Sequence, residues 1–108
     1  MFLVITMSNK IYSINEIKEK LNSLVKDTEI NKIILFGSYA KNVATENSDI
    51  DLVIDSKGKL MGFKLFSLIS KIEELFNKNV DAFEISEIIK DSLIEKEIST
   101  TGVIVYDK

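Results

Sequence analysis

Residues 36–55 read FGSYAKNVATENSDIDLVID and carry most of the functional information in the chain. A turn at Gly37 and Ser38 ends one apolar run, and an Asp-Ile-Asp sequence containing Asp49 and Asp51 opens the next. Side chains two positions apart on a strand point to the same face, so these two carboxylates converge. Paired carboxylates without a basic neighbour suit Mg²⁺, which binds one or two carboxylates together with substrate phosphates. Because the turn offers N–H groups and a hydroxyl to phosphate oxygens, the sequence predicts a metal-dependent nucleotide site.

Composition excludes several other classes of site. The chain has 108 residues, which is enough for one domain with one core. It contains neither Cys nor His, which excludes disulfides, thiolate or imidazole metal sites and a Ser-His-Asp triad. All fourteen basic residues are Lys and the net charge is −3, which argues against sequence-specific binding of nucleic acid. The apolar segment 1–6 is too short for a signal peptide or a membrane span, so we expect a cytoplasmic protein without membrane contact.

The hydrophobic pattern predicts alternating helices and strands. Ser13 and Glu16 form a capping box before a helical apolar repeat, which predicts a helix over 14–26. Two further helices and four strands follow from apolar runs, caps and turn residues. The expected elements are strands 32–36, 50–54, 80–84 and 103–106, and helices 60–77 and 87–99, the last of them capped by Ser86 and buried through Ile88, Ile89, Leu93, Ile94 and Ile98. A short helical turn is also considered for 39–43, within the loop 37–47.

The order of these elements predicts an α/β (α+β) fold. It consists of a mixed four-stranded sheet with helices mainly on one face. The whole chain, 1–108, is expected to be a single domain, in which residues 1–12 are either a tail or an edge strand.

The combination of Gly37, Ser38, ten intervening residues and the Asp49-Ile50-Asp51 sequence resembles the signature of the DNA polymerase beta-like nucleotidyltransferase superfamily. The small size resembles the minimal nucleotidyltransferase (MNT) branch, several members of which are antitoxins encoded beside a HEPN-domain ribonuclease toxin. This resemblance implies the polymerase beta-like nucleotidyltransferase fold and transfer of AMP from ATP to a hydroxyl group. For the antitoxin branch it implies a tyrosine of the HEPN toxin as the acceptor.

The resemblance also implies roles for individual residues. Gly37 and Ser38 would hold the triphosphate, and Asp49 and Asp51 would bind two Mg²⁺ ions. Asp81 is the expected third metal ligand and catalytic carboxylate, because it matches the family's Val-Asp pair at the start of a later strand. By strand parity, Glu84 lies on the face opposite to Asp81, whereas Phe83 shares the face of Asp81.

The chain departs from the family pattern after the turn, where Lys41 and Asn42 stand in place of the usual Arg-Gly. Lys41 keeps a positive charge for nucleotide binding, but without the planar fork of Arg. Asn42 is the residue type other than Gly that best tolerates a left-handed backbone. Ser48 is a candidate for nucleotide binding, with ordering of the loop as its alternative role. Tyr39 either packs on the loop or lies over the nucleotide.

Three functions remain open at this level. The first is an AMP-transferring antitoxin that acts on a HEPN partner. The second is a non-catalytic binding module with the same fold. The third is a nucleotidyltransferase for small molecules such as aminoglycosides.

Overall fold

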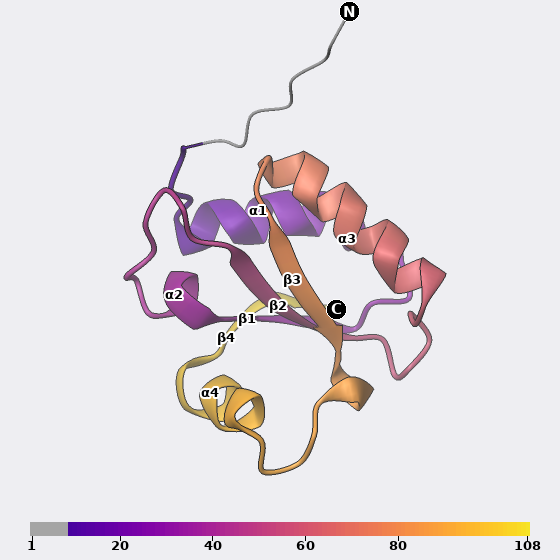
Figure 1. Cartoon of the computed structure of the whole chain (residues 1–108). Coiled ribbons are helices and arrows are strands. Elements are labelled where there is room, and N and C mark those ends of the chain that lie inside the picture. Colours follow the sequence, from indigo (N-terminus) through magenta and orange to yellow (C-terminus); the bar gives the residue numbers. More distant parts are fainter. Residues whose placement is uncertain (1–8) are drawn as a thin grey trace, which may run out of the picture.

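In the computed structural model, residues 9–108 are described, and they fold into a sheet with helices on both of its faces (Figure 1). The part of the expected tail or edge strand at residues 1–8 lies outside the described residues. The elements run in the order α1 (Ile14–Val25), β1 (Lys32–Phe36), α2 (Gly37–Ala40), β2 (Ile50–Asp55), α3 (Phe63–Phe76), β3 (Val80–Glu84), the short 3₁₀ helix η1 (Ile85–Glu87), α4 (Leu93–Thr101) and β4 (Val103–Asp107).

The sheet is mixed and has four strands within the described residues, as the sequence predicted. The strand order is β3-β2-β1-β4. Strand β1 is antiparallel to both β2 and β4, and β2 is parallel to β3. The register places Asp51 of β2 between Phe36 of β1 and Asp81 of β3. Two of the acidic residues singled out in the sequence therefore lie side by side in the sheet.

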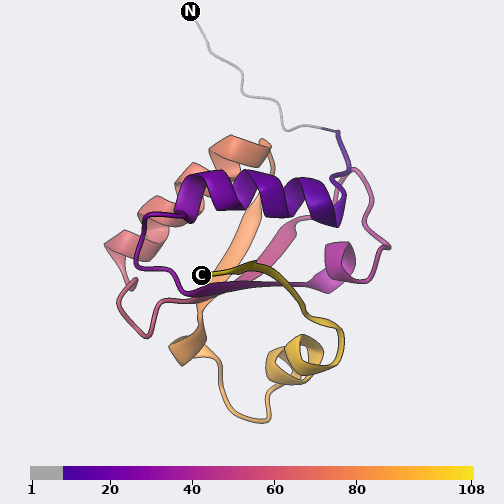
Figure 2. The same cartoon turned by 180° about the vertical axis from the view of Figure 1, so that it is seen from behind.

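The two long helices, α1 and α3, cover one face of the sheet and enclose the core (Figures 1 and 2). The predicted capping box begins α1: the N–H of Glu16 donates to Ser13 Oγ (3.1 Å), and the N–H of Ser13 donates to Glu16 Oε1 (3.0 Å). At the far end of α3, the Tyr12 hydroxyl donates to the main-chain oxygen of Phe76 (2.7 Å), and the two rings meet edge to face. The completely buried apolar side chains include Ile17, Leu21, Val25, Ile33, Leu35, Ile50, Leu52, Ile54, Ile72 and Phe76.

The opposite face carries α4 and the segment before it, and here the sequence prediction was wrong. The helix expected over 87–99 begins only at Leu93. Asp91 has a left-handed backbone (φ +63°), which a helix cannot continue through. Ser92 caps the helix by accepting the N–H of Glu95 (3.2 Å), and Glu95 Oε1 accepts the N–H of Asp91 (2.8 Å). The signal was the Ser-x-x-Glu spacing of Ser92 and Glu95, which Ser86 lacks.

The burial expected for this last helix was also wrong. Ile89 is 74% exposed and Leu93 is 84% exposed. Two smaller differences concern helix starts: α3 begins at Phe63, after Gly62 with φ +58°, and the helical turn after β1 is at Gly37–Ala40.

Among residues 9–108, no helix combines the length and the apolar character that crossing a bilayer requires.

Candidate active site

The three predicted carboxylates lie at one edge of the sheet, where β2 and β3 begin. Asp51 and Asp81 are register partners on these parallel strands, and Asp49 immediately precedes β2. Neighbouring strands are about 4.8 Å apart, and residues two positions apart share a face. The intervening Ile50 is completely buried in the core cluster with residues of α1 and α3, so the carboxylates, which alternate with it, belong to the opposite face, that of α4. Asp49 and Asp81 are exposed, and Asp51 is half-buried.

The Gly-Ser turn lies directly against Asp51. Gly37 is buried and has φ +74°, and a Cβ on it would overlap the Asp51 carboxylate. Only glycine permits both this backbone conformation and this close approach. Ser38 follows in α2, whose first-turn N–H groups have no partners within the helix. The predicted phosphate-binding turn and the predicted metal ligands are therefore neighbours in space.

At this edge of the sheet, the close spacing of the carboxylates opposes the ionisation of all of them at once. Burial, together with the smaller effects of the nearby carboxylates of Asp81, Asp49 and Glu97, raises the pKa of Asp51 to about 6. A divalent cation would reverse this effect, because it favours the ionised carboxylate. The raised pKa thus marks Asp51 as the centre of the acidic group.

The chemistry of the donor set fits Mg²⁺, since the side chains offer oxygen atoms alone. Within residues 9–108, however, no three acidic side chains are already arranged as a complete set of ligands around one ion. Asp49 and Asp81 are exposed and free to rotate about their side-chain bonds. The backbone thus places the three carboxylates at one edge, and their roles as metal ligands remain a prediction.

The remaining predicted site residues have defined contacts. Lys41 Nζ forms an ion pair with Glu97 Oε1 of α4 (2.9 Å). The Ser48 hydroxyl accepts the N–H of Thr45 (2.9 Å), which orders the loop before Asp49. Asn42 has φ +59°, the left-handed conformation expected where the family has glycine. Tyr39 is 2% exposed and belongs to the core, so it does not lie over a nucleotide.

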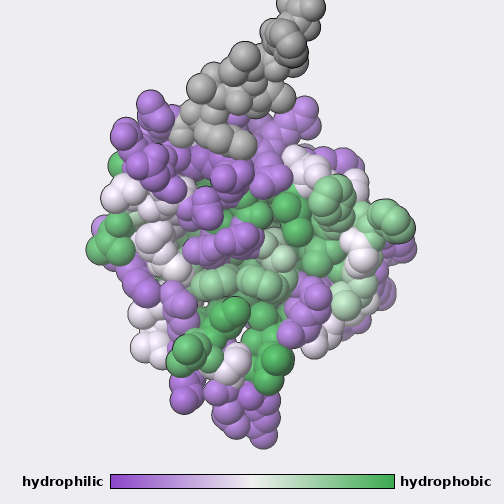
Figure 3. All heavy atoms as spheres, viewed as in Figure 1, coloured by the Kyte–Doolittle hydropathy of each residue, from purple (hydrophilic) through white to green (hydrophobic). Residues whose placement is uncertain are grey.

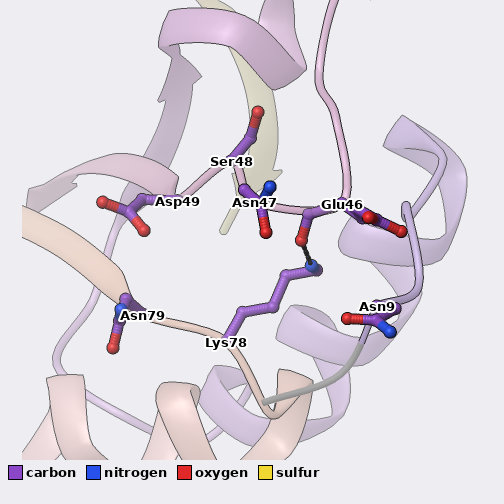
Figure 4. Close-up of a pocket in the computed structure, with 7 residues that line it drawn as sticks. All are labelled: Asn9, Glu46, Asn47, Ser48, Asp49, Lys78 and Asn79. Atoms are coloured by element: carbon purple, nitrogen blue, oxygen red, sulfur yellow. Dashed lines mark hydrogen bonds between the residues drawn. The ribbon is translucent and has the colours of Figure 1, made fainter.

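A polar cavity of about 230 Å³ adjoins Asp49 on the outer side of this loop (Figure 4). Lys78, which sequence reasoning missed, is 3% exposed and extends across the cavity so that its Nζ donates to the main-chain oxygen of Glu46 (2.9 Å). The N–H of Ile50 donates to the main-chain oxygen of Asn79 (3.0 Å). The turn before β3 therefore holds the loop that carries Asp49. A Lys among polar residues gives no sequence signal for such burial.

Glu84 is a second residue whose importance the sequence did not reveal. It lies on the opposite face from Asp81, as parity predicted, and it is completely buried. Its Oε2 accepts the hydroxyl (2.6 Å) and the N–H (2.8 Å) of Ser56 and the N–H of Gly58 (3.1 Å), and Oε1 accepts the N–H of Ser86 (2.7 Å). Burial alone raises the pKa of Glu84, but the hydrogen bonds from Ser56 and Ser86 outweigh burial and lower the pKa to about 2. Glu84 joins the loop after β2 to the end of β3.

The fold and the acidic edge define a nucleotidyltransferase of the polymerase beta type. The family described as "Polymerase beta, Nucleotidyltransferase" matches residues 15–108, so the chain belongs to this family. It is 32% identical over 90 residues to "Putative protein adenylyltransferase MJ0435" of Methanocaldococcus jannaschii, covering 80% of this chain and 96% of that protein. It is 34% identical over 89 residues to the similarly named MJ0128 of the same organism, covering 82% and 90% of the two chains.

Solved structures with the same fold include antitoxins of HEPN/MNT toxin-antitoxin pairs. A toxin-antitoxin structure with AMP-PNP superposes with a TM-score of 0.73 at 22% identity, over 84% of this chain and 73% of the other. A complex of a tri-AMPylated HEPN toxin of Shewanella oneidensis with its MNT antitoxin gives a TM-score of 0.65 at 20% identity, over 84% and 70%. At these identities the likeness establishes the fold.

Proposed function

We propose that this protein is a Mg²⁺-dependent adenylyltransferase that moves AMP from ATP to a hydroxyl group of a partner protein. The proposed partner is a HEPN-domain toxin, the acceptor is a tyrosine of that toxin, and the consequence is neutralisation of the toxin. Support comes from the family, from relatives named protein adenylyltransferases, and from fold neighbours in complexes with HEPN toxins. The match over residues 15–108 also supports treating the chain as one nucleotidyltransferase domain.

One observation carries the proposal: Gly37 packs so closely on Asp51 that a side chain there would overlap the carboxylate. The turn that would hold phosphates and the carboxylates that would hold metal ions are thus built as one unit. A solvated strand face would need neither the positive φ of Gly37 nor this close approach. The raised pKa of Asp51 supports the same interpretation, because perturbed acidic groups cluster at functional sites.

The proposed roles of the individual residues are as follows. Asp49 and Asp51 would hold two Mg²⁺ ions, and Asp81 would hold one of them. When bound, Mg²⁺ would neutralise charge on the phosphate oxygens and acidify the attacking hydroxyl. Gly37 and Ser38 would bind the triphosphate through main-chain N–H groups and a hydroxyl.

The reaction is an in-line substitution at the α-phosphorus of ATP. The hydroxyl oxygen of the acceptor forms a bond to that phosphorus, the bond to the bridging oxygen of the β-phosphate breaks, and pyrophosphate leaves. The hydroxyl proton passes to the carboxylate of Asp81. Lys41 would exchange Glu97 for a phosphate oxygen of the nucleotide, as a point charge.

The test uses the full chain, ATP labelled at the α-phosphate, Mg²⁺ and the product of the neighbouring gene, which we expect to be a HEPN-domain protein. We expect the label on a tyrosine of the HEPN protein and its loss in Asp49→Asn. Asp55→Asn is the matched control, because Asp55 lies at the other end of β2, where its Oδ1 accepts the N–H of Lys57 (3.1 Å). If the Asp49→Asn variant still neutralises the toxin, the result favours the non-catalytic binding module. If only an aminoglycoside is labelled, the result favours the small-molecule enzyme.

A further inference from the structure

Two groups of exposed apolar side chains stand out among residues 9–108. The first, the α3 patch, consists of Met61, Phe63 and Phe66, of which Phe63 is 93% exposed. The second, the α4 groove, is a cavity of about 240 Å³ lined by Phe83, Glu87, Ile88, Ile89, Ser92 and Ile94. Ile89, which lines the groove, is 74% exposed, and Leu93, between the lining residues Ser92 and Ile94 in the sequence, is 84% exposed. Figure 3 shows strongly hydrophobic residues gathered over α4 and the segment that precedes it, in the lower part of the view.

The position of the α4 groove relative to the acidic edge distinguishes it from the α3 patch. Phe83 follows Asp81 by two residues on β3, so both side chains project from the same face of the sheet. On β2, Val53 likewise follows Asp51 by two residues and so lies on the same face. It lines a second, smaller cavity of about 150 Å³ under α4. The α3 patch belongs to a helix that packs on the other face. Of the two surfaces, the α4 groove adjoins the proposed transfer site.

Helix α4 is only partly buried against the sheet. None of the residues in Leu93–Thr101 is buried, although the helix carries Leu93, Ile94 and Ile98. The cavity between it and β2 is lined mainly by apolar side chains of Val53, Ile85, Ile88 and Ile98. Exposed apolar side chains grouped around a hollow are typical of a surface that another protein covers.

Charge around the α4 groove indicates what kind of surface it suits. Glu87 lines the groove, and Asp91, Glu95 and Glu97 are further acidic residues of the same segment, against Lys90 and Lys96 and against Lys41, which is paired with Glu97. The segment therefore keeps an excess of negative charge, and the whole chain has a net charge of −3. Electrostatic complementarity therefore favours an apolar segment flanked by Lys or Arg.

We propose that the α4 groove is the docking surface for the protein that accepts AMP. The acceptor places an apolar segment with basic flanks against Phe83, Ile89 and Leu93, and its hydroxyl then reaches Asp81 along the same face of β3. This inference rests on the proposed function, since it concerns the acceptor of that same site. It also explains how this domain selects a protein substrate.

The test compares Leu93→Lys, alone and combined with Ile89→Lys, with the matched control Phe63→Lys. All three side chains are at least 74% exposed, so their replacement leaves the fold intact. The probe is the product of the neighbouring gene, which the proposed function expects to be a HEPN-domain protein. We expect Kd and KM for this protein to rise about tenfold or more in the groove variants, and less than twofold in Phe63→Lys. The affinity for ATP, measured by calorimetry, remains at the wild-type value throughout.

The outcomes separate this inference from the proposed function. Unchanged Kd and KM in the double variant, or an equal loss in Phe63→Lys, would overturn the docking surface while labelling of the acceptor still stands. If the groove variants lose partner binding but the wild type transfers no label, the transfer reaction is overturned and the docking surface is retained. A homodimer that Leu93→Lys dissociates, with partner affinity unchanged, would assign the groove to a second copy of the chain and overturn the proposal.

Discussion

The two faces of the sheet differ in how completely they are packed. On the face of α1 and α3, side chains such as Ile17, Leu21 and Phe76 are completely buried, and a capping box begins α1. On the face of α4, the sheet presents ionisable groups, Gly37 approaches Asp51 closely, and the covering helix buries none of its residues. The comparison teaches that one face supplies most of the stability, whereas the other leaves room for ligands.

The largest expected effect tests the packed face. Phe76→Ala removes a completely buried ring that contacts Tyr12 edge to face at a centroid distance of 5.0 Å. We expect the free energy of unfolding to fall by about 3–5 kcal/mol, because the lost contacts leave a cavity. Phe63→Ala on the same helix, at a 93% exposed position, should change it by less than about 0.5 kcal/mol. Urea denaturation measures both, and equal losses would show that α3 does not anchor the core.

The next effect tests the close approach on the open face. Gly37→Ala places a methyl group in the position of the Asp51 carboxylate and should reduce AMP transfer by about a hundredfold, which corresponds to roughly 2.7 kcal/mol. Gly58→Ala is the matched control: its φ is +77°, but the nearest atom to a Cβ is Ser86 Oγ at 3.9 Å. Both substitutions place a side chain on a backbone with positive φ, but only Gly37→Ala displaces the Asp51 carboxylate. Equal rates in the two would remove the contact from the mechanism.

Glu84 connects the loop after β2 to the sheet, and its replacement tests a polar contribution to stability. Glu84→Gln removes the charge and makes an amide NH2 group face a donor in either orientation, at Ser56 or at Ser86, so we expect the free energy of unfolding to fall by about 2–3 kcal/mol. The exposed Glu74→Gln serves as the control. Thermal unfolding at neutral pH measures the difference, and an unchanged melting temperature would contradict the role assigned to Glu84.

The pH dependence of stability tests the electrostatics of the acidic edge. The pKa of Asp51 is raised from 3.8 to about 6 in the folded protein, so its uncharged form is favoured there. This contribution to stability is complete below about pH 3.8 and is lost as the pH rises through about 6.

Asp51→Asn should therefore stabilise the protein at pH 8 relative to the wild type, by on the order of 1–2 kcal/mol more than at pH 4. Asp27→Asn, at an exposed position, is the control. Denaturation series at several pH values measure the effect, and parallel curves for wild type and Asp51→Asn would contradict the raised pKa.

The smallest expected effect concerns the ion pair between Lys41 and Glu97. Glu97→Gln releases Lys41 for the triphosphate and removes a negative charge that acts on Asp51. Because exposed ion pairs are weak, the affinity for ATP should rise only about two- to threefold. Calorimetric titration measures it at low salt, with Glu19→Gln on α1 as the control. A weaker affinity in Glu97→Gln would show that Glu97 supports nucleotide binding instead.

The sequence was most informative where local rules and tertiary packing agree. The bounds of β1 and β3 were predicted correctly, because short apolar segments bounded by turn residues leave little alternative. The start of α1 followed from the capping box at Ser13 and Glu16. The left-handed backbone at Asn42 followed from the family's glycine.

Prediction failed where two local signals competed. The spacing of the apolar residues 88, 89, 93 and 94 is that of a helical repeat. The left-handed backbone at Asp91 nevertheless interrupts it, and Ser92 caps a helix that begins after it. The exposure of Leu93 was also beyond the sequence, because periodicity identifies an apolar face without identifying what covers it.

The amino-acid sequence by itself determined most of the elements, the family resemblance and the residues proposed for the site, since periodicity, caps and the spacing of Gly37, Asp49 and Asp51 are local properties. Tertiary structure alone decided that Asp81 is the register partner of Asp51, that Lys78 and Glu84 are buried, and that Lys41 meets Glu97. The physical reason is that strand register and burial depend on contacts between residues distant in the chain. Such contacts are set by how the whole apolar surface packs.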